Sequence, residues 1–169
     1  MVPSKKAAMP KINQHHATIV DFIMDIPLFD ELNSHELGIV ADHMNFIEIE
    51  EGEILFKEGD HGDYVCFVLK GSLDIVKETR AQGEMVTIAT ISRKRSIGEM
   101  SVIDNTTRSA TAIARSKTSL VSLPQESFNA ILDRHPKMGI KILKGIARLM
   151  SLNMRKTSSR LADYILPDC

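Results

Sequence analysis

The sequence contains no tryptophan and only two cysteines, and aromatic residues make up 5% of its 169 residues. Two distant cysteines cannot supply the ligands of an iron–sulfur cluster, and neither has the spacing of a metal site. Cys66 lies in an apolar run, which favours a buried small hydrophobe, and Cys169 is the last residue. We therefore expect no metal centre of this kind and a reducing, cytoplasmic compartment.

Long apolar runs, an excess of charge and catalytic motifs are also absent. No stretch approaches the roughly 18 consecutive apolar residues of a transmembrane helix. A net charge of −1 argues against a chain that coats nucleic acid. None of the six histidines forms an HxH or HExxH arrangement, and the sequence has neither GxSxG nor a P-loop. We therefore expect no membrane partner, no metal and no enzymatic activity, and direct DNA binding is disfavoured.

The residues that are present favour helices at both ends and strands between them. Apolar residues at helical spacing predict one helix over residues 18–29 and a second over 36–43, capped near Asn33. Between residues 46 and 124, alternating short segments with glycine turns predict strands, and 64–78 is interpreted as a strand pair hinged at Gly71. This pattern is typical of antiparallel sandwiches and jelly rolls.

We therefore predict a mainly β fold with flanking helices (α+β), an antiparallel jelly-roll β-barrel with N-terminal helices and a long C-terminal helix. A short helix follows Pro124, and the long helix begins at Pro136. Apolar residues of the long helix recur in steps of three and four, which predicts a homodimer through a heptad seam. The alternative is that this face packs back on its own barrel. The seam consists of Leu143, Ala147, Met150, Met154, Thr157, Leu161 and Tyr164.

The segment "IGEMSVIDNTTRSAT", residues 97–111, places a carboxylate and a guanidinium nine residues apart. Gly98 permits a close backbone approach, and the turn after Glu99 leaves free N–H groups of the kind that bind phosphate. Arg108 can add a bidentate contact to phosphate oxygens, while Glu99 can accept from a sugar hydroxyl. The alternative is a surface ion pair between Glu99 and Arg108, worth about 0–1 kcal/mol. The residues alone leave both interpretations open.

The same segment resembles the phosphate-binding cassette of the cyclic-nucleotide-binding domain family, as found in catabolite activators and regulatory subunits of protein kinase A. The resemblance covers about residues 26–153 and includes the glycine turns of 51–76. The family pattern differs here at Ile97, Ser101 and Thr107, where an aromatic residue, alanine and proline are common. The residues that match the cassette are Gly98, Glu99, Met100, Arg108, Ser109 and Ala110.

The resemblance implies a role for each matching residue. Glu99 accepts from the ribose 2′-OH, and Arg108 holds the exocyclic phosphate oxygens. The amides of Ser101 and Ser109 complete the phosphate cradle, and Gly98 and Met100 line the sugar. Ser109 after the arginine favours cAMP over cGMP as the ligand, and no other cofactor is implied.

The base is expected to meet residues outside the cassette. Asn153 matches the position from which catabolite activators reach the base, although a polar residue there could equally set the register of a helix pair. Ile91 and Ala89 are expected to form part of an apolar wall for the base, and core packing would explain them equally well.

These inferences imply a receptor that passes a signal to an unknown downstream protein. We expect a flexible arm over residues 1–17, a barrel with leading helices over 18–135, and a helix over 136–169 that serves dimerisation and closes over the ligand. The basic run at residues 93–95 is interpreted as a solvated turn. Two alternatives remain: an interaction protein that no longer binds ligand, or a transcription regulator of the catabolite-activator type that acts through a DNA-binding partner, because no helix-turn-helix is evident.

Overall fold

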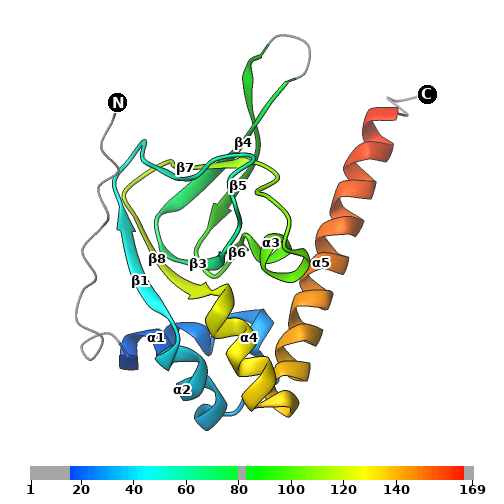
Figure 1. The fold of residues 1–169 in the computed structure, drawn as a ribbon. Coiled ribbons are helices and arrows are strands. Elements are labelled where there is room, and N and C mark those ends of the chain that lie inside the picture. Colours follow the sequence, from blue (N-terminus) through cyan, green and yellow to red (C-terminus); the bar gives the residue numbers. More distant parts are fainter. Residues whose placement is uncertain (1–15, 80–82, 166–169) are drawn as a thin grey trace.

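A computed structural model describes residues 16–79 and 83–165, with helices packed below and beside two β-sheets (Figure 1). The expected first helix is shorter than predicted, because it ends at Ile23 and a 3-10 turn follows at Pro27. Of the expected N-terminal arm, residues 1–15 lie outside the described residues. The elements are α1 His16–Ile23, η1 Pro27–Phe29, α2 Ser34–Asp42, β1 Asn45–Ile49, β2 Ile54–Phe56, β3 Tyr64–Lys70, β4 Ser72–Glu78, β5 Met85–Ser92, β6 Ser96–Ile97, α3 Glu99–Asp104, β7 Thr111–Ala114, β8 Thr118–Pro124, α4 Gln125–Arg134 and α5 Pro136–Ile165.

The strands form two four-stranded antiparallel sheets, with orders β1-β8-β3-β6 and β2-β7-β4-β5. The jelly-roll prediction is confirmed, although the two sheets are separate. The predicted pairing of the two halves of segment 64–78 is wrong, because β3 and β4 belong to different sheets. Gly71 between them has φ 83°, and a β-carbon there would lie 2.4 Å from the carbonyl oxygen of Lys117. This glycine lets the chain turn from one sheet to the other instead of forming a hairpin.

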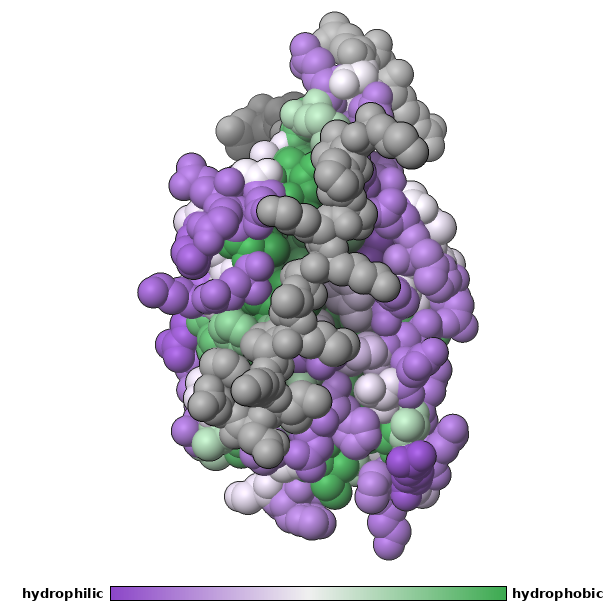
Figure 2. Space-filling view, turned by 60° about the vertical axis from the view of Figure 1, so that its left-hand side comes forward, coloured by the Kyte–Doolittle hydropathy of each residue, from purple (hydrophilic) through white to green (hydrophobic). Residues whose placement is uncertain are grey.

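Strand β3 is buried on both faces, which explains its nearly continuous apolar sequence. Because successive side chains point to opposite faces, Val65 and Phe67 pack toward the helices, while Cys66 and Val68 pack between the sheets. The larger core therefore lies between the helices and the β1-β8-β3-β6 sheet. On the side of the molecule in Figure 2, hydrophilic residues cover most of the coloured surface.

The helices beneath this sheet are set by local signals that the sequence carries. Asn33 caps α2 as predicted, since its Oδ1 accepts from the Glu36 amide at 3.0 Å and the Glu36 carboxylate accepts from the Asn33 amide at 2.9 Å. Glu36 also accepts from Lys141 Nζ at 2.8 Å, which joins α2 to α5. This ion pair therefore links α2 directly to α5 at this end of the molecule.

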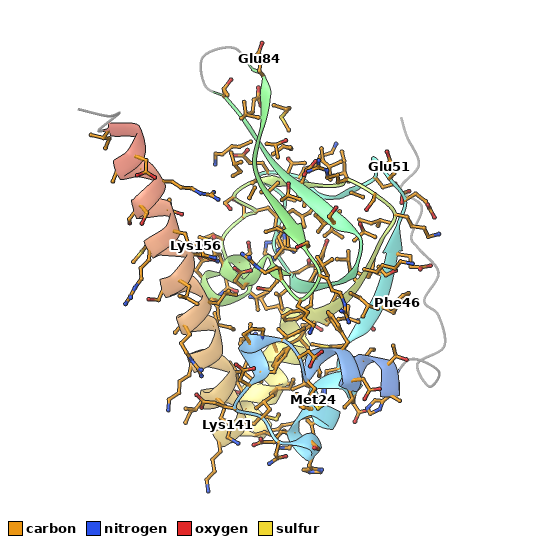
Figure 3. The ribbon with its side chains drawn as sticks, turned by 180° about the vertical axis from the view of Figure 1, so that it is seen from behind. Met24, Phe46, Glu51, Glu84, Lys141 and Lys156 are labelled. Carbon is orange, nitrogen blue, oxygen red and sulfur yellow. The ribbon has the colours of Figure 1, made fainter. Side chains whose placement is uncertain are left out.

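The first half of α5 packs tightly on the rest of the chain. A β-carbon at Gly145 would lie 2.1 Å from the carbonyl oxygen of Leu28, so the helix backbone lies directly against η1. Ile142 and Ile146 are buried on the same face, and Arg148 pairs with Glu31. The second half of α5, around Lys156, extends past the helices at the base of the molecule and runs beside the β-sheets (Figure 3). No helix among the described residues is long and apolar enough to cross a membrane.

Candidate functional site

A pocket of about 310 Å³ opens between the β2-β7-β4-β5 sheet, the segment from β6 to β7, and α5. The structure brings together in its wall all nine residues predicted as ligand contacts: Gly98, Glu99, Met100, Ser101, Arg108, Ser109, Ile91, Ala89 and Asn153. The other lining residues are Phe56, Ile75, Ile88, Arg95, Ser96, Ile97, Ala110 and Leu149.

Arg108 is the most constrained charged residue of this pocket, because its side chain is only 3% exposed. Its backbone is fixed by the amide of Arg108 donating to the Asp60 carbonyl at 2.8 Å and by its carbonyl accepting from the Gly59 amide at 2.9 Å. Nη2 donates to the Tyr64 carbonyl at 2.8 Å, and the guanidinium carbon lies 4.3 Å from the Phe56 ring centroid and 4.6 Å from that of Tyr64. The cation is therefore held between two aromatic faces.

No carboxylate pairs with this buried cation. Among the described residues, Arg108 forms no ion pair, and its Nε is buried without a hydrogen-bond partner. The surface ion pair between Glu99 and Arg108, which the sequence left open, is therefore absent. Burying a charge without a counter-charge is costly, so an anion entering the pocket would complete the environment of Arg108.

Glu99 is the second unusual group, at the first position of α3. Its Oε2 is buried and has no hydrogen-bond partner. Besides the large pocket, it borders a small void of about 10 Å³ among Phe29, Ile142 and other apolar residues. Burial raises the pKa of the Glu99 carboxyl above its usual value, and the backbone amide of Glu99, the charge of Arg95, the Ser96 hydroxyl and the charge of Arg108 act against this rise. One carboxylate oxygen of Glu99 is thus buried at the pocket wall without a hydrogen-bond partner among the described residues.

The backbone before and within α3 is shaped around these two side chains. Gly98 has φ 87° and lies at the N-cap of α3. The amides of Met100 and Ser101, in the first helical turn, have no carbonyl acceptor inside the helix. The Ser101 side chain is buried against Gly62, where a β-carbon would lie 2.1 Å from the Ser101 β-carbon. The Ser101 amide, rather than its hydroxyl, is therefore the group suited to a ligand.

The far end of the pocket is bordered by α5 and by the edge strand β5. Asn153 is partly buried and lies one turn after Leu149, which also lines the pocket. On β5, the pairing with β4 shifts register between Ile75 and Val76, so Ile88 is an extra residue there and lines the pocket together with Ala89 and Ile91. Asn153 and the apolar residues of β5 therefore border the same pocket.

Sequence reasoning missed several lining residues, for different reasons. Leu149 could have been found, because it lies four residues before Asn153 on the same helix face. Phe56 could not, because its ring meets Arg108 only after β2 pairs with β7. Arg95 belonged to a run interpreted as a solvated turn. Among residues 16–79 and 83–165, no group of three histidine, cysteine or acidic side chains could hold a metal ion.

The chain that forms this pocket is similar to known proteins. The family model described as the cyclic nucleotide-binding domain matches residues 46–135, just over half of the chain. A lysophospholipase NTE1 from Chaetomium globosum is 37% identical over 107 residues, which are 63% of this chain and 7% of that protein. The chain therefore corresponds to a small part of the length of this relative.

Two solved structures extend the likeness to the helices. A cyclic nucleotide-binding domain from Methylobacillus flagellatus superposes with a TM-score of 0.80 at 28% identity, covering 89% of this chain and 84% of that chain. The regulatory domain of Toxoplasma gondii protein kinase A with cAMP superposes with a TM-score of 0.64 at 27% identity, covering 72% of this chain and 46% of that chain.

Proposed function

The chain belongs to the cyclic nucleotide-binding domain family, and from this we propose that its pocket binds a purine cyclic monophosphate, cAMP in preference to cGMP. The observation that carries the proposal is Arg108, a buried guanidinium with an unpartnered Nε and no ion-pair partner among the described residues. A cyclic phosphate supplies both the missing charge and the missing acceptor. The cAMP complex of the Toxoplasma gondii relative supports the same class of ligand.

Each end of a cyclic nucleotide finds complementary groups in the pocket. Arg108 binds the exocyclic phosphate oxygens, with the amides of Ser101 and Ser109 as further donors. Glu99 accepts from the ribose 2′-OH, because its Oε2 has no other donor. Gly98 and Met100 line the sugar. Binding would thus satisfy two buried polar groups that the free protein leaves unpaired.

The base lies toward α5 in this proposal. Ile91 and Ala89 cover one face of the ring, and the amide of Asn153 reads the polar edge. The preference for cAMP rests on Ser109, as the family resemblance implies. A base held by Asn153 joins the sheet to the helix, so ligand binding changes the position or order of the second half of α5.

The exposed seam of α5 supports a role in passing this change onward. Two of its residues are well exposed, Met154 at 70% and Leu161 at 57%, whereas Ile142 on the packed face of α5 is buried. A second copy of this chain, packed through the seam, would bury these side chains in heptad fashion. We propose that the ligand-dependent change in α5 is passed on through this homodimer, or to a downstream protein that binds the same face.

The proposal is tested by calorimetric titration with cAMP, cGMP and cyclic di-GMP. The variants are Arg108→Ala and, as a matched control, Arg155→Ala, because Arg155 is exposed on α5 and does not line the pocket. We expect saturable binding of cAMP that the first variant loses and the second retains. No heat with any of the three ligands would overturn the proposal and favour a ligand-free interaction protein.

A further inference from the structure

Lys77 on β4 contacts the cassette segment 97–111 without lining the pocket itself. Its Nζ donates to the carbonyl of Ser109 at 2.9 Å and pairs with the carboxylate of Glu58 at 3.1 Å. Ser109, in contrast, lines the pocket and directly follows the buried Arg108. One ammonium group therefore connects three segments that are distant in sequence: β4, the turn after β2, and the cassette.

Glu58 offers Lys77 a carboxylate on a fixed backbone, because the turn around it is closed by hydrogen bonds. The Lys57 amide donates to Asp60 Oδ2 at 2.8 Å, and the Asp60 amide donates to the Lys57 carbonyl at 3.1 Å. The Glu58 amide donates to Thr111 Oγ1 at 2.9 Å. The turn is thus closed on itself and also bonded to the start of β7.

Ser109 is restrained at the peptide groups on both of its sides. Its amide belongs to the same peptide group as the Arg108 carbonyl, which accepts from the Gly59 amide at 2.9 Å. Its own carbonyl accepts from Lys77. Ser109 is exposed, unlike its neighbours Arg108 and Ala110, so packing contributes little to its position. Because each peptide group is planar, these two hydrogen bonds restrict the direction in which the Ser109 amide points.

The ion pair contributes geometry to the site rather than charge or fold stability. The side chains of Lys77 and Glu58 are 49% and 38% exposed, and pairs of this kind stabilise a fold only slightly. Because the carboxylate offsets the ammonium, the pair as a whole adds little positive field at the pocket. What remains is the contact between Lys77 and the Ser109 carbonyl.

We propose that Lys77 is a positioning residue of the nucleotide site, which holds Ser109 so that its amide is directed at one exocyclic phosphate oxygen. A hydrogen bond weakens steeply when its donor turns away from the acceptor. A donor that is already held in place also loses less conformational freedom when the ligand binds. Glu58 belongs to the same arrangement, because it keeps the ammonium at the carbonyl. The ligand part of this inference rests on the proposed function.

The effect on Ser109 is measured without ligand, from NMR order parameters of the backbone amides. We expect Lys77→Met to lower the order parameters of Ser109 and Ala110, because the peptide group between them loses its restraint. Lys117→Met is the matched control, because Lys117 is also an exposed lysine paired with a glutamate and does not line the pocket. Unchanged order parameters in Lys77→Met would overturn the inference whether or not the protein binds a nucleotide.

The second measurement uses cAMP and its two phosphorothioate diastereomers, in which sulfur replaces one or the other exocyclic oxygen. Sulfur is the poorer acceptor, so the diastereomer with sulfur at the Ser109 amide gains little from that amide. We expect Lys77→Met to weaken cAMP and the other diastereomer about tenfold and this one far less. Lys77→Arg keeps a donor for the carbonyl and should restore most of the affinity. Equal weakening of all three ligands would show a general loss of structure and rule out positioning.

Glu58→Ala separates the position of Lys77 from its charge. If Lys77 acted through its charge on the phosphate, removal of the neighbouring carboxylate would tighten cAMP binding. We expect weaker binding, because the ammonium is no longer held at the Ser109 carbonyl. Glu50→Ala is the matched control, because Glu50 pairs with Lys117. Unchanged or tighter binding in Glu58→Ala would contradict the proposal. If wild-type protein binds none of these nucleotides, the proposed function and the ligand part both fail, and the order parameters alone decide the role of Lys77.

Discussion

Gly98 lies directly against the guanidinium of Arg108: a β-carbon at Gly98 would come within 2.3 Å of Nη1. The same Nη1 donates to the Gly98 carbonyl at 3.3 Å. Gly98 also has φ 87°, a conformation that other residues adopt only with strain. One missing side chain thus permits both the turn into α3 and the position of the buried cation.

Gly98→Ala is expected to damage both stability and binding. The left-handed conformation costs about 1–2 kcal/mol for a residue with a β-carbon, and the methyl group displaces Arg108. Gly38→Ala is the matched control, because Gly38 lies within α2 and a β-carbon there meets nothing within 4 Å. We expect the control to stabilise the fold by up to about 1 kcal/mol. Urea unfolding and cAMP titration measure the two effects, and an undamaged Gly98→Ala would contradict this account.

The sequence was sufficient for features that depend on local spacing. The resemblance that Gly98, Glu99 and Arg108 carry implied a cassette, and the structure brings these residues into one pocket, while Asn33 predicted the start of α2. It was insufficient where distant segments meet. Alternation predicts strands but does not assign them to sheets, which is why the Gly71 turn was misinterpreted. The carbonyl of Tyr64, which binds Arg108 across 44 positions of sequence, depends on how β3 packs and leaves no local signal.

Arg108→Lys separates the charge of this residue from its shape. Lysine keeps the positive charge but has no planar fork, and its single ammonium cannot bind the Tyr64 carbonyl and two phosphate oxygens with the same geometry. We expect a loss of about 1.5–3 kcal/mol in cAMP binding energy, because charge-assisted hydrogen bonds are lost. Calorimetry measures the loss. Affinity equal to wild type would mean that the pocket needs only a positive charge.

Glu99→Gln is expected to stabilise the free protein while it weakens nucleotide binding. The folded-state pKa of Glu99 is raised above its ordinary value of 4.5. At a pH between the ordinary pKa and the raised folded-state pKa, the folded state binds more protons than the unfolded state. The free energy of unfolding therefore falls as pH rises through that window. Glutamine removes both this pH dependence and the buried charge. At pH values above the folded-state pKa of Glu99, we expect the variant's free energy of unfolding to be higher than that of wild type by about 1 kcal/mol.

The measurement for Glu99→Gln is urea unfolding of both proteins from pH 4 to pH 8, in the absence of ligand. Wild type and variant should converge at the acid end, where Glu99 is protonated, and diverge as pH rises. If the free energies of unfolding of the two proteins differ by the same amount at every pH, the pKa of Glu99 is the same in the folded and unfolded states, which would contradict the prediction. In the same pH range, cAMP binding to wild type should weaken as pH falls through the folded-state pKa.

Met150→Glu combined with Met154→Glu is expected to dissociate a homodimer that forms through α5. Both side chains lie on the exposed seam, where two facing carboxylates would repel their counterparts. Ser151→Glu is the matched control, because Ser151 is exposed on the same helix but outside the seam. Sedimentation equilibrium measures the molecular mass in solution of the wild type, the double variant and the control. A wild-type protein that stays monomeric at high concentration would contradict the dimer proposal.

Cys66 offers a readout of ligand binding that does not depend on heats. Its side chain is fully buried, and burial raises the pKa of its thiol to about 12, so a thiol reagent reaches it only when the fold opens. In a Cys169→Ser background, we expect labelling of the native protein to be far slower than labelling in urea. If labelling requires global opening, cAMP at about 100 times its dissociation constant should slow it roughly a hundredfold, because binding stabilises the closed state by about 2.7 kcal/mol. Arg108→Ala should remove this protection while leaving Cys66 slow to react without ligand. Rapid labelling of the native wild type would instead show that the space between the sheets opens locally.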